Sequence, residues 1–258
     1  MGGDPLRVLT YNVRYANLDT GWVEWPERRD AVASTIRHHR PDAVAVQECW
    51  MEQLPDLRTR LPEYEWVAHP DDNGEHTPIA YRPERLTVER SGAYGLAPEG
   101  ERGVPAWDAA APRQATHATF TDRETGVPFT LTSVHLDHRG ERAREEGARL
   151  VHERVPDGHV VVAGDCNCGP TDPPYAVLAG DLTDAREAAP YTHGPAETYV
   201  GFDGDGTGEE GDPERRRLDY VFVRGFEVAG YAVAADVNGA WRHPSDHLPV
   251  VADLRPAE

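Results

Sequence analysis

The chain has 258 residues, of which 45 are acidic and 26 are basic, so its formal net charge is −19. Such a charge repels polyanions, and no run of five or more basic residues offsets it, so duplex nucleic acid is disfavoured as a substrate. No stretch is apolar enough to span a membrane, the N-terminus does not resemble a secretory signal, and the three cysteines form no disulfide framework. We therefore expect a cytoplasmic protein with no membrane partner.

The first third of the chain predicts a strand–helix–strand unit. Residues 6–13 and 42–48 are apolar and rich in β-formers, which is typical of buried strands. Between them, residues 27–39 have apolar side chains at helical spacing and stop before Pro41. This order favours a parallel or mixed sheet that the helix covers. A short helix at 52–61 and strands at 65–69 and 79–82 follow.

The rest of the chain predicts more strand than helix. Residues 91–112 are rich in Gly, Pro and Ala and predict a long loop. The further expected elements are a hairpin of 116–121 with 128–136, a helix at 140–155, a strand at 159–164, a short helix at 175–179, paired strands at 218–223 and 228–234, and a last strand at 248–254. Residues 202–214 predict an acidic loop, whose EF-hand-like spacing we interpret as solvated because no flanking helices are expected. No linker divides the chain, so we predict one α/β domain over residues 1–258.

Polar side chains capable of chemistry recur at the ends of these apolar strands. Side chains at strand ends can converge on one crevice, and a buried strand has no structural need for a charge at its tip. Each motif alone could be an ordinary turn, since Asp and Asn readily bond their own backbone. Taken together they predict one site, made of Asn12, Glu48, His135, Asp165, Asn167, Asp219, Asp246 and His247.

This mixture of residue types suits phosphoester hydrolysis. Glu48 with Asn12 or Asp246 offers the oxygen ligands that a hard cation such as Mg²⁺ prefers, and the cation would neutralise charge on phosphate oxygens. Asp165 is suited to orienting and deprotonating the attacking water. Donors for the phosphoryl oxygens are His135, Asn167 and His247.

Six short motifs, in this order, resemble the endonuclease/exonuclease/phosphatase superfamily. They are TYNV at 10–13, QE at 47–48, VHLDH at 134–138, GDCN at 164–167, LDYVF at 218–222 and SDHLP at 245–249. The likeness extends from residue 6 to residue 254. It implies a four-layered α/β sandwich of two packed mixed β-sheets flanked by helices, with the site at one rim.

The resemblance also implies roles for the metal-binding residues. Glu48 resembles the principal ligand of Mg²⁺ or Mn²⁺, with Asn12 and Asp246 supporting it. Arg14 stands where some endonucleases carry a second metal-contacting Asp, so a two-metal arrangement is disfavoured.

For the catalytic residues, the resemblance implies that Asp165 positions the attacking water and Asn167 holds water or a phosphate oxygen. His247 contacts the scissile phosphate, and Asp219 orients and charges it. His135 contacts the phosphate or the leaving group.

A narrower likeness to a group of bacterial hydrolases rests on WPER at 25–28, PRQA at 112–115, HLDH at 135–138 with AR at 143–144, and Tyr199-x-Gly201-Phe202. It implies phosphate binding by Arg113 foremost and by Arg28 and Arg144 with less support, because Arg offers a bidentate fork. Surface ion pairs are the alternative for these arginines. Cys166 is expected to pack in the core, and Cys168 is a weak candidate for a reactive thiol.

The leading functional hypothesis is a divalent-metal-dependent phosphoester hydrolase, either phosphatase or phosphodiesterase. Its substrate would be a small phosphorylated metabolite, nucleotide or headgroup, split by in-line attack of water activated by Asp165. The alternative is a metal-dependent nuclease acting on DNA or RNA, which the charge balance disfavours. A non-catalytic scaffold is a third hypothesis, but all eight site positions keep suitable residues.

Overall fold

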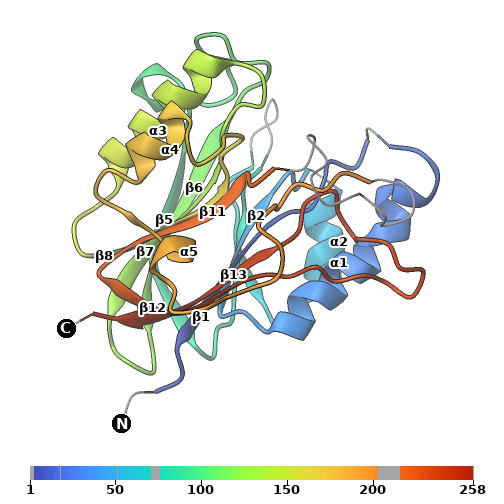
Figure 1. Cartoon of the computed structure of the whole chain (residues 1–258), viewed down its shortest axis with the longest axis horizontal. Coiled ribbons are helices and arrows are strands. Elements are labelled where there is room, and N and C mark those ends of the chain that lie inside the picture. Colours follow the sequence, from blue (N-terminus) through green and yellow to red (C-terminus); the bar gives the residue numbers. More distant parts are fainter. Residues whose placement is uncertain (1–2, 18, 51, 71–75, 203–215, 258) are drawn as a thin grey trace.

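The computed structural model describes residues 3–17, 19–50, 52–70, 76–202 and 216–257. Within these residues, two β-sheets pack face to face and helices cover both outer faces (Figure 1). The expected four-layered sandwich is confirmed. Apart from Phe202, the predicted acidic loop and its EF-hand-like spacing lie outside the described residues.

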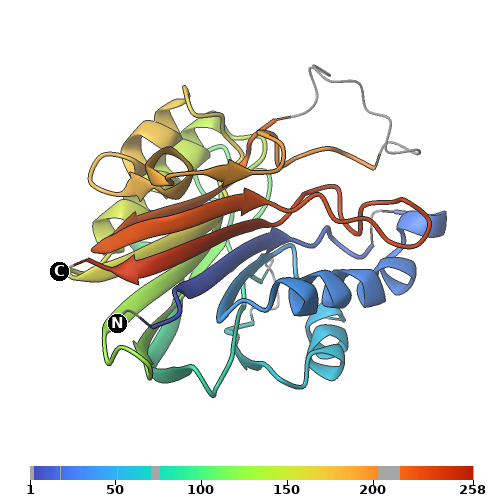
Figure 2. The ribbon, with the colours of Figure 1, turned by 60° about the horizontal axis from the view of Figure 1, so that its bottom comes forward.

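The first sheet has seven strands and contains both ends of the described chain (Figure 2). In spatial order the strands are β10 (Thr192–His193), β12 (Phe226–Val233), β13 (Val250–Pro256), β1 (Leu6–Asn12), β2 (Ala43–Gln47), β4 (Ile79–Tyr81) and β3 (Glu65–Val67). The parallel pairing of β1 with β2 confirms the predicted strand–helix–strand unit. Its outer face is covered by α1 (Trp25–His39) and α2 (Gln53–Arg60).

The second sheet has six strands and carries the other helical layer. In order the strands are β5 (Leu86–Gly95), β6 (Gln114–Asp122), β7 (Pro128–His135), β8 (His159–Asp165), β11 (Asp219–Arg224) and β9 (Thr183–Asp184). Its outer face packs on α3 (Glu141–Arg154) and α4 (Pro173–Leu178). The remaining short helices are α5 (Ala185–Ala188), η1 (Gly21–Val23) and η2 (Pro98–Gly100). No helix of the described ranges is both long and apolar enough to cross a membrane.

The central strands are apolar throughout because both of their faces are buried. In β1, Val8 points into the core between the sheets, whereas Leu9 packs with the helices outside. In β8, Val161 and Val162 alternate in the same way. Successive strand residues point to opposite faces, so a strand between two layers needs apolar side chains at every position.

Two predictions about the strands are wrong. The expected loop at 91–112 begins with the end of β5, an edge strand that is half exposed and irregular between Val88 and Arg90, so it lacks an apolar pattern. The expected pairing of 218–223 with 228–234 does not occur, because β11 pairs with β8 and β9 whereas β12 pairs with β13 and β10. Gly225, at φ 75°, connects the two sheets, and its backbone approaches His159 too closely for a side chain.

Candidate active site

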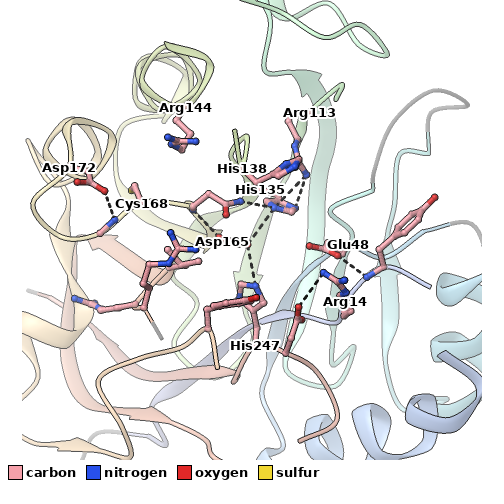
Figure 3. A pocket seen from close by; sticks show the side chains of 18 of the residues that line it. Arg14, Glu48, Arg113, His135, His138, Arg144, Asp165, Cys168, Asp172 and His247 are labelled. Atoms are coloured by element: carbon pink, nitrogen blue, oxygen red, sulfur yellow. Dashed lines mark hydrogen bonds and ion pairs between the residues drawn. The ribbon is translucent and has the colours of Figure 1, made fainter. Parts of the chain in front are cut away.

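A cavity of about 870 Å³ opens at one rim of the sandwich, where the ends of β1, β2, β7 and β8 meet the start of β11 (Figure 3). The parallel register aligns His135 with Asp165, and the antiparallel neighbour places Asp219 opposite Asp165. Six of the eight predicted residues line the cavity, and Asn12 and Asp219 lie buried behind it. The structure therefore brings the predicted residues together.

Asp165 lies at the centre of the site and is almost completely buried. Its Oδ1 accepts the Asn167 backbone N–H at 2.8 Å, and its Oδ2 accepts the Asn12 side-chain amide at 3.0 Å. The Nε2 atoms of His135 and His247 lie 3.4 and 3.7 Å from the same Oδ2. Burial raises the pKa of Asp165, and the two histidines oppose that shift. A carboxylate with a raised pKa is a better proton acceptor.

His247 is paired with a carboxylate that keeps it protonated. Its Nδ1 lies 2.8 Å from Asp219 Oδ2, and both side chains are buried. Burial alone would lower the pKa of His247, but Asp219 and Asp165 more than offset it and raise the pKa to about 10. An imidazolium with its Nε2–H toward the cavity is a fixed positive donor, which suits a phosphoryl oxygen.

Asn12 links the two halves of the site through its amide. Its Oδ1 accepts the Arg14 backbone N–H at 3.0 Å. Its Nδ2 donates to Glu48 Oε1 at 3.1 Å and to Asp165 Oδ2 at 3.0 Å. This arrangement favours an orienting role for Asn12, and its role as a direct metal ligand stays a prediction.

Glu48 and Asp246 form a carboxylate pair whose chemistry fits a divalent cation. Burial raises the pKa of Asp246, and the neighbouring Glu48 carboxylate raises it further. Arg14 Nη1 lies 3.3 Å from Asp246 Oδ2 and offsets part of the negative charge. Two carboxylates that repel each other at the rim of a cavity offer the oxygen ligands that Mg²⁺ and Mn²⁺ prefer.

A second set of possible ligand atoms, from Asp165, Asp219 and His247, lies within 4.8 Å of one another. In this set the imidazole is already committed, because His247 is protonated and bonded to Asp219. An imidazolium has no lone pair to give a metal. The Glu48–Asp246 pair is therefore the better candidate for holding a cation.

The backbone at the site is held in an unfavourable conformation at three positions. Arg14, Glu48 and Asn167 have φ values of 59°, 55° and 48°, in the left-handed region that L-residues seldom adopt. Such conformations persist only where the surrounding structure enforces them, and they cluster at functional sites. The turns after β1, β2 and β8 thus direct these side chains into the rim.

Arg113 lines the cavity as predicted for a substrate-binding residue, but its guanidinium also contacts the chain itself. Its Nη1 lies 3.0 Å from His135 Nδ1, its Nη2 lies 2.8 Å from His138 Nδ1, and its Nε lies 3.5 Å from Asp137. Asn167 Nδ2 lies 3.0 Å from His135 Nε2. Arg113 therefore positions both histidines, whatever it contributes to the substrate.

Other residues at the site differ from the sequence-based interpretation. Arg28 is neither a phosphate ligand nor a surface ion pair, because it is buried and donates to the backbone carbonyls of Val13 and Pro244. Cys168 is buried, and burial raises its pKa to about 12, so it is not a reactive thiol. Cys166 packs in the core, as expected.

The arginines at 216 and 217 line the cavity, although sequence reasoning had assigned them no role. Their position directly before the LDYVF motif was a signal that could have identified them.

Known proteins resemble this chain in both sequence and fold. The sequence profile described as the endonuclease/exonuclease/phosphatase family matches residues 9–247. A structure of this family from Bacteroides vulgatus is 31% identical, covers 98% of this chain and 100% of that chain, and superposes with a TM-score of 0.89. The mannosyl-6-phosphatase of Bacteroides thetaiotaomicron is 31% identical over 97% of this chain and 99% of its own, with a TM-score of 0.86.

Among curated sequences, nocturnin of Drosophila melanogaster is 22% identical over 98% of this chain. The chain spans only 47% of nocturnin's length. The profile match and the two solved structures cover nearly the whole chain, and the two structures share its sandwich fold. The chain belongs to the endonuclease/exonuclease/phosphatase family.

Proposed function

We propose that this protein is a divalent-metal-dependent hydrolase of small phosphoesters, acting first of all on phosphomonoesters. The observation that carries the proposal is the convergence, in one cavity, of a carboxylate pair, a buried base and an imidazolium donor. These are Glu48 with Asp246, then Asp165, then His247. Members of the family are phosphoester hydrolases, and this set supplies the charges that such a reaction requires.

The side chains divide the work of an in-line displacement. Asp165 holds the attacking water and takes its proton on a carboxylate oxygen, which its raised pKa favours. His247 donates from Nε2 to a phosphoryl oxygen, where negative charge grows as the water attacks. His135 and Asn167 complete the set of donors around the phosphoryl group. Glu48 and Asp246 would hold Mg²⁺ or Mn²⁺, which supplies charge neutralisation to the phosphoryl oxygens when bound.

Three observations support a small substrate. The cavity of about 870 Å³ suits a metabolite or a nucleotide. The net charge of −19 opposes approach of a long polyanion. The mannosyl-6-phosphatase, at 31% identity over nearly the whole chain, acts on a phosphorylated sugar according to its name. These observations favour a phosphatase over the nuclease alternative.

The test is a panel of phosphomonoesters, phosphodiesters and supercoiled plasmid, assayed with Mg²⁺, with Mn²⁺ and with EDTA. We expect hydrolysis of small phosphomonoesters that EDTA abolishes and that Asp165→Asn lowers by roughly a thousandfold or more. Glu145→Gln, which changes a partly exposed carboxylate on α3 that pairs with Arg149, is the matched control and should leave turnover unchanged. Hydrolysis that persists in EDTA and in Asp165→Asn would refute the proposal. Faster cleavage of plasmid than of every small ester would favour the nuclease.

A further inference from the structure

We propose that Arg144 forms a second anion subsite in the cavity, so that the preferred substrate carries another anionic group besides the phosphate that is split. This inference rests on the proposed function. It assigns a substrate class: phosphoesters whose leaving group bears a phosphate or a carboxylate.

Five arginines line the cavity among the described residues. Three are neutralised by carboxylates of the chain: Arg14 by Asp19 and Asp246, Arg113 by Asp137, and Arg217 by Asp184. The other two, Arg144 and Arg216, have no carboxylate within 4.0 Å among the residues that the structure describes.

Arg144 is held in place by the backbone beside it. It extends from α3 toward the cavity and is half buried (Figure 3). Its Nη1 donates to the backbone carbonyl of Asp137 at 3.0 Å, which fixes the position of the guanidinium. A guanidinium has five N–H donors in a planar fork, so most of them remain for a ligand. Partial burial of a charge without a counter-ion is costly, and a bound phosphate or carboxylate would remove that cost.

Arg144 lies apart from the residues proposed to act on the scissile phosphate. In Figure 3, Arg144 lies on the opposite side of the Asp165–His247 pair from Glu48 and Arg14. In the proposed reaction, His247 would donate to the scissile phosphoryl group, and Glu48 and Asp246 would hold the cation that neutralises it. Arg144 makes its described contact with the Asp137 carbonyl rather than with these groups. An anion on Arg144 is therefore a separate group of the same substrate.

Among the described lining residues, the exposed carboxylate nearest in sequence to the Cys168 loop is Asp172. Asp172 belongs to the loop beside Cys168, and its Oδ2 accepts the Gly169 backbone N–H at 2.7 Å. Asp172 is exposed, so water screens it more than it screens the half-buried Arg144. Arg216 adds a further positive charge at the rim, over the ring of Tyr199 at 5.9 Å. Among the described lining residues, Arg144 and Arg216 are thus cations without a carboxylate partner.

The experiment measures binding without turnover, by titration calorimetry with Mg²⁺ in an Asp165→Asn background. The probes are alkanediol bisphosphates from ethanediol to hexanediol, each compared with the alkyl monophosphate of the same length. We expect at least one bisphosphate to bind about tenfold or more tightly than its monophosphate. Arg144→Gln should remove that preference, because it should weaken binding of the bisphosphate much more than binding of the monophosphate. Arg149→Gln, an exposed arginine on the same helix that pairs with Glu145, is the control and should keep the preference.

Two outcomes would overturn the subsite. One is equal weakening of monophosphate and bisphosphate by Arg144→Gln, because Arg144 would then hold the scissile phosphate. The other is the absence of a bisphosphate preference at every length. If the preference is present but the wild-type protein hydrolyses no phosphoester, the subsite stands and the proposed function fails.

Discussion

Replacing Asp219 by asparagine would test whether the charge on His247 comes from its carboxylate partner. Asp219 Oδ2 lies 2.8 Å from His247 Nδ1, and Asp165 Oδ2 lies farther away, at 3.7 Å from Nε2. Asparagine keeps the size of the side chain and removes the negative charge. Burial, which lowers the pKa of His247, would then be opposed mainly by Asp165. We expect the pKa of His247 to fall by roughly one to three pH units from about 10.

The same pKa predicts how stability changes with pH. The folded-state pKa of His247, about 10, lies above its ordinary value of 6.5. The protonated His247 therefore stabilises the folded state fully below pH 6.5, and this stabilisation is lost as pH rises through about 10. Its upper limit is about 5 kcal/mol, at about 1.4 kcal/mol per pH unit. The Asp219→Asn variant should lose roughly 1 to 4 kcal/mol of this stabilisation of the folded state.

The assay combines proton NMR titration of His247 with urea denaturation across this pH range, both in EDTA. Wild-type His247 should stay protonated through pH 8, whereas the variant should titrate below the wild type. Turnover should fall by about 10²- to 10³-fold, because a preformed donor to the phosphoryl oxygen is lost. Asp253→Asn, which removes a surface partner of Arg7, is the control. A measured pKa near 6.5 for wild-type His247 would refute the reasoning, and so would the same His247 pKa in Asp219→Asn as in the wild type.

Three further predictions concern the metal, the frame of the site and the sheet connection. Mg²⁺ should raise the melting temperature of the wild type but not of Glu48→Gln, measured by scanning calorimetry, and equal shifts would argue against Glu48 as a ligand. Arg28→Met should lower the free energy of unfolding in urea by about 2 to 4 kcal/mol, since buried carbonyls lose their donor, and a change under 1 kcal/mol would contradict this. Gly225→Val should lower the free energy of unfolding by at least about 2 kcal/mol in the same assay, because Gly225 has a positive φ and an added Cβ would lie 2.9 Å from His159. Gly239→Val is the control and should lower it less, because the space around Gly239 is open.

Much of the fold could be predicted from local patterns. The central strands between two layers are apolar at every position, so β1, β2 and β8 are recognisable from a few residues each. The eight residues predicted for the site were recognisable because charged and amide side chains recur, motif after motif, at the ends of buried strands, where burial of polar groups is costly. The edge strand β5 was missed because half of its surface faces water.

What the sequence by itself determined is the central strands, the helices that cover them and the group of residues that meets at the rim. Only the tertiary structure decided which strands pair, that the Asn12 amide joins Glu48 to Asp165, and that Arg28 is buried while Arg144 faces the cavity. The physical reason is that strand periodicity is a property of neighbouring residues. By contrast, the strand that pairs with a given edge lies far away in the chain. The same holds for the groups that bond a side-chain amide or a guanidinium, and the packing of the layers brings these segments together.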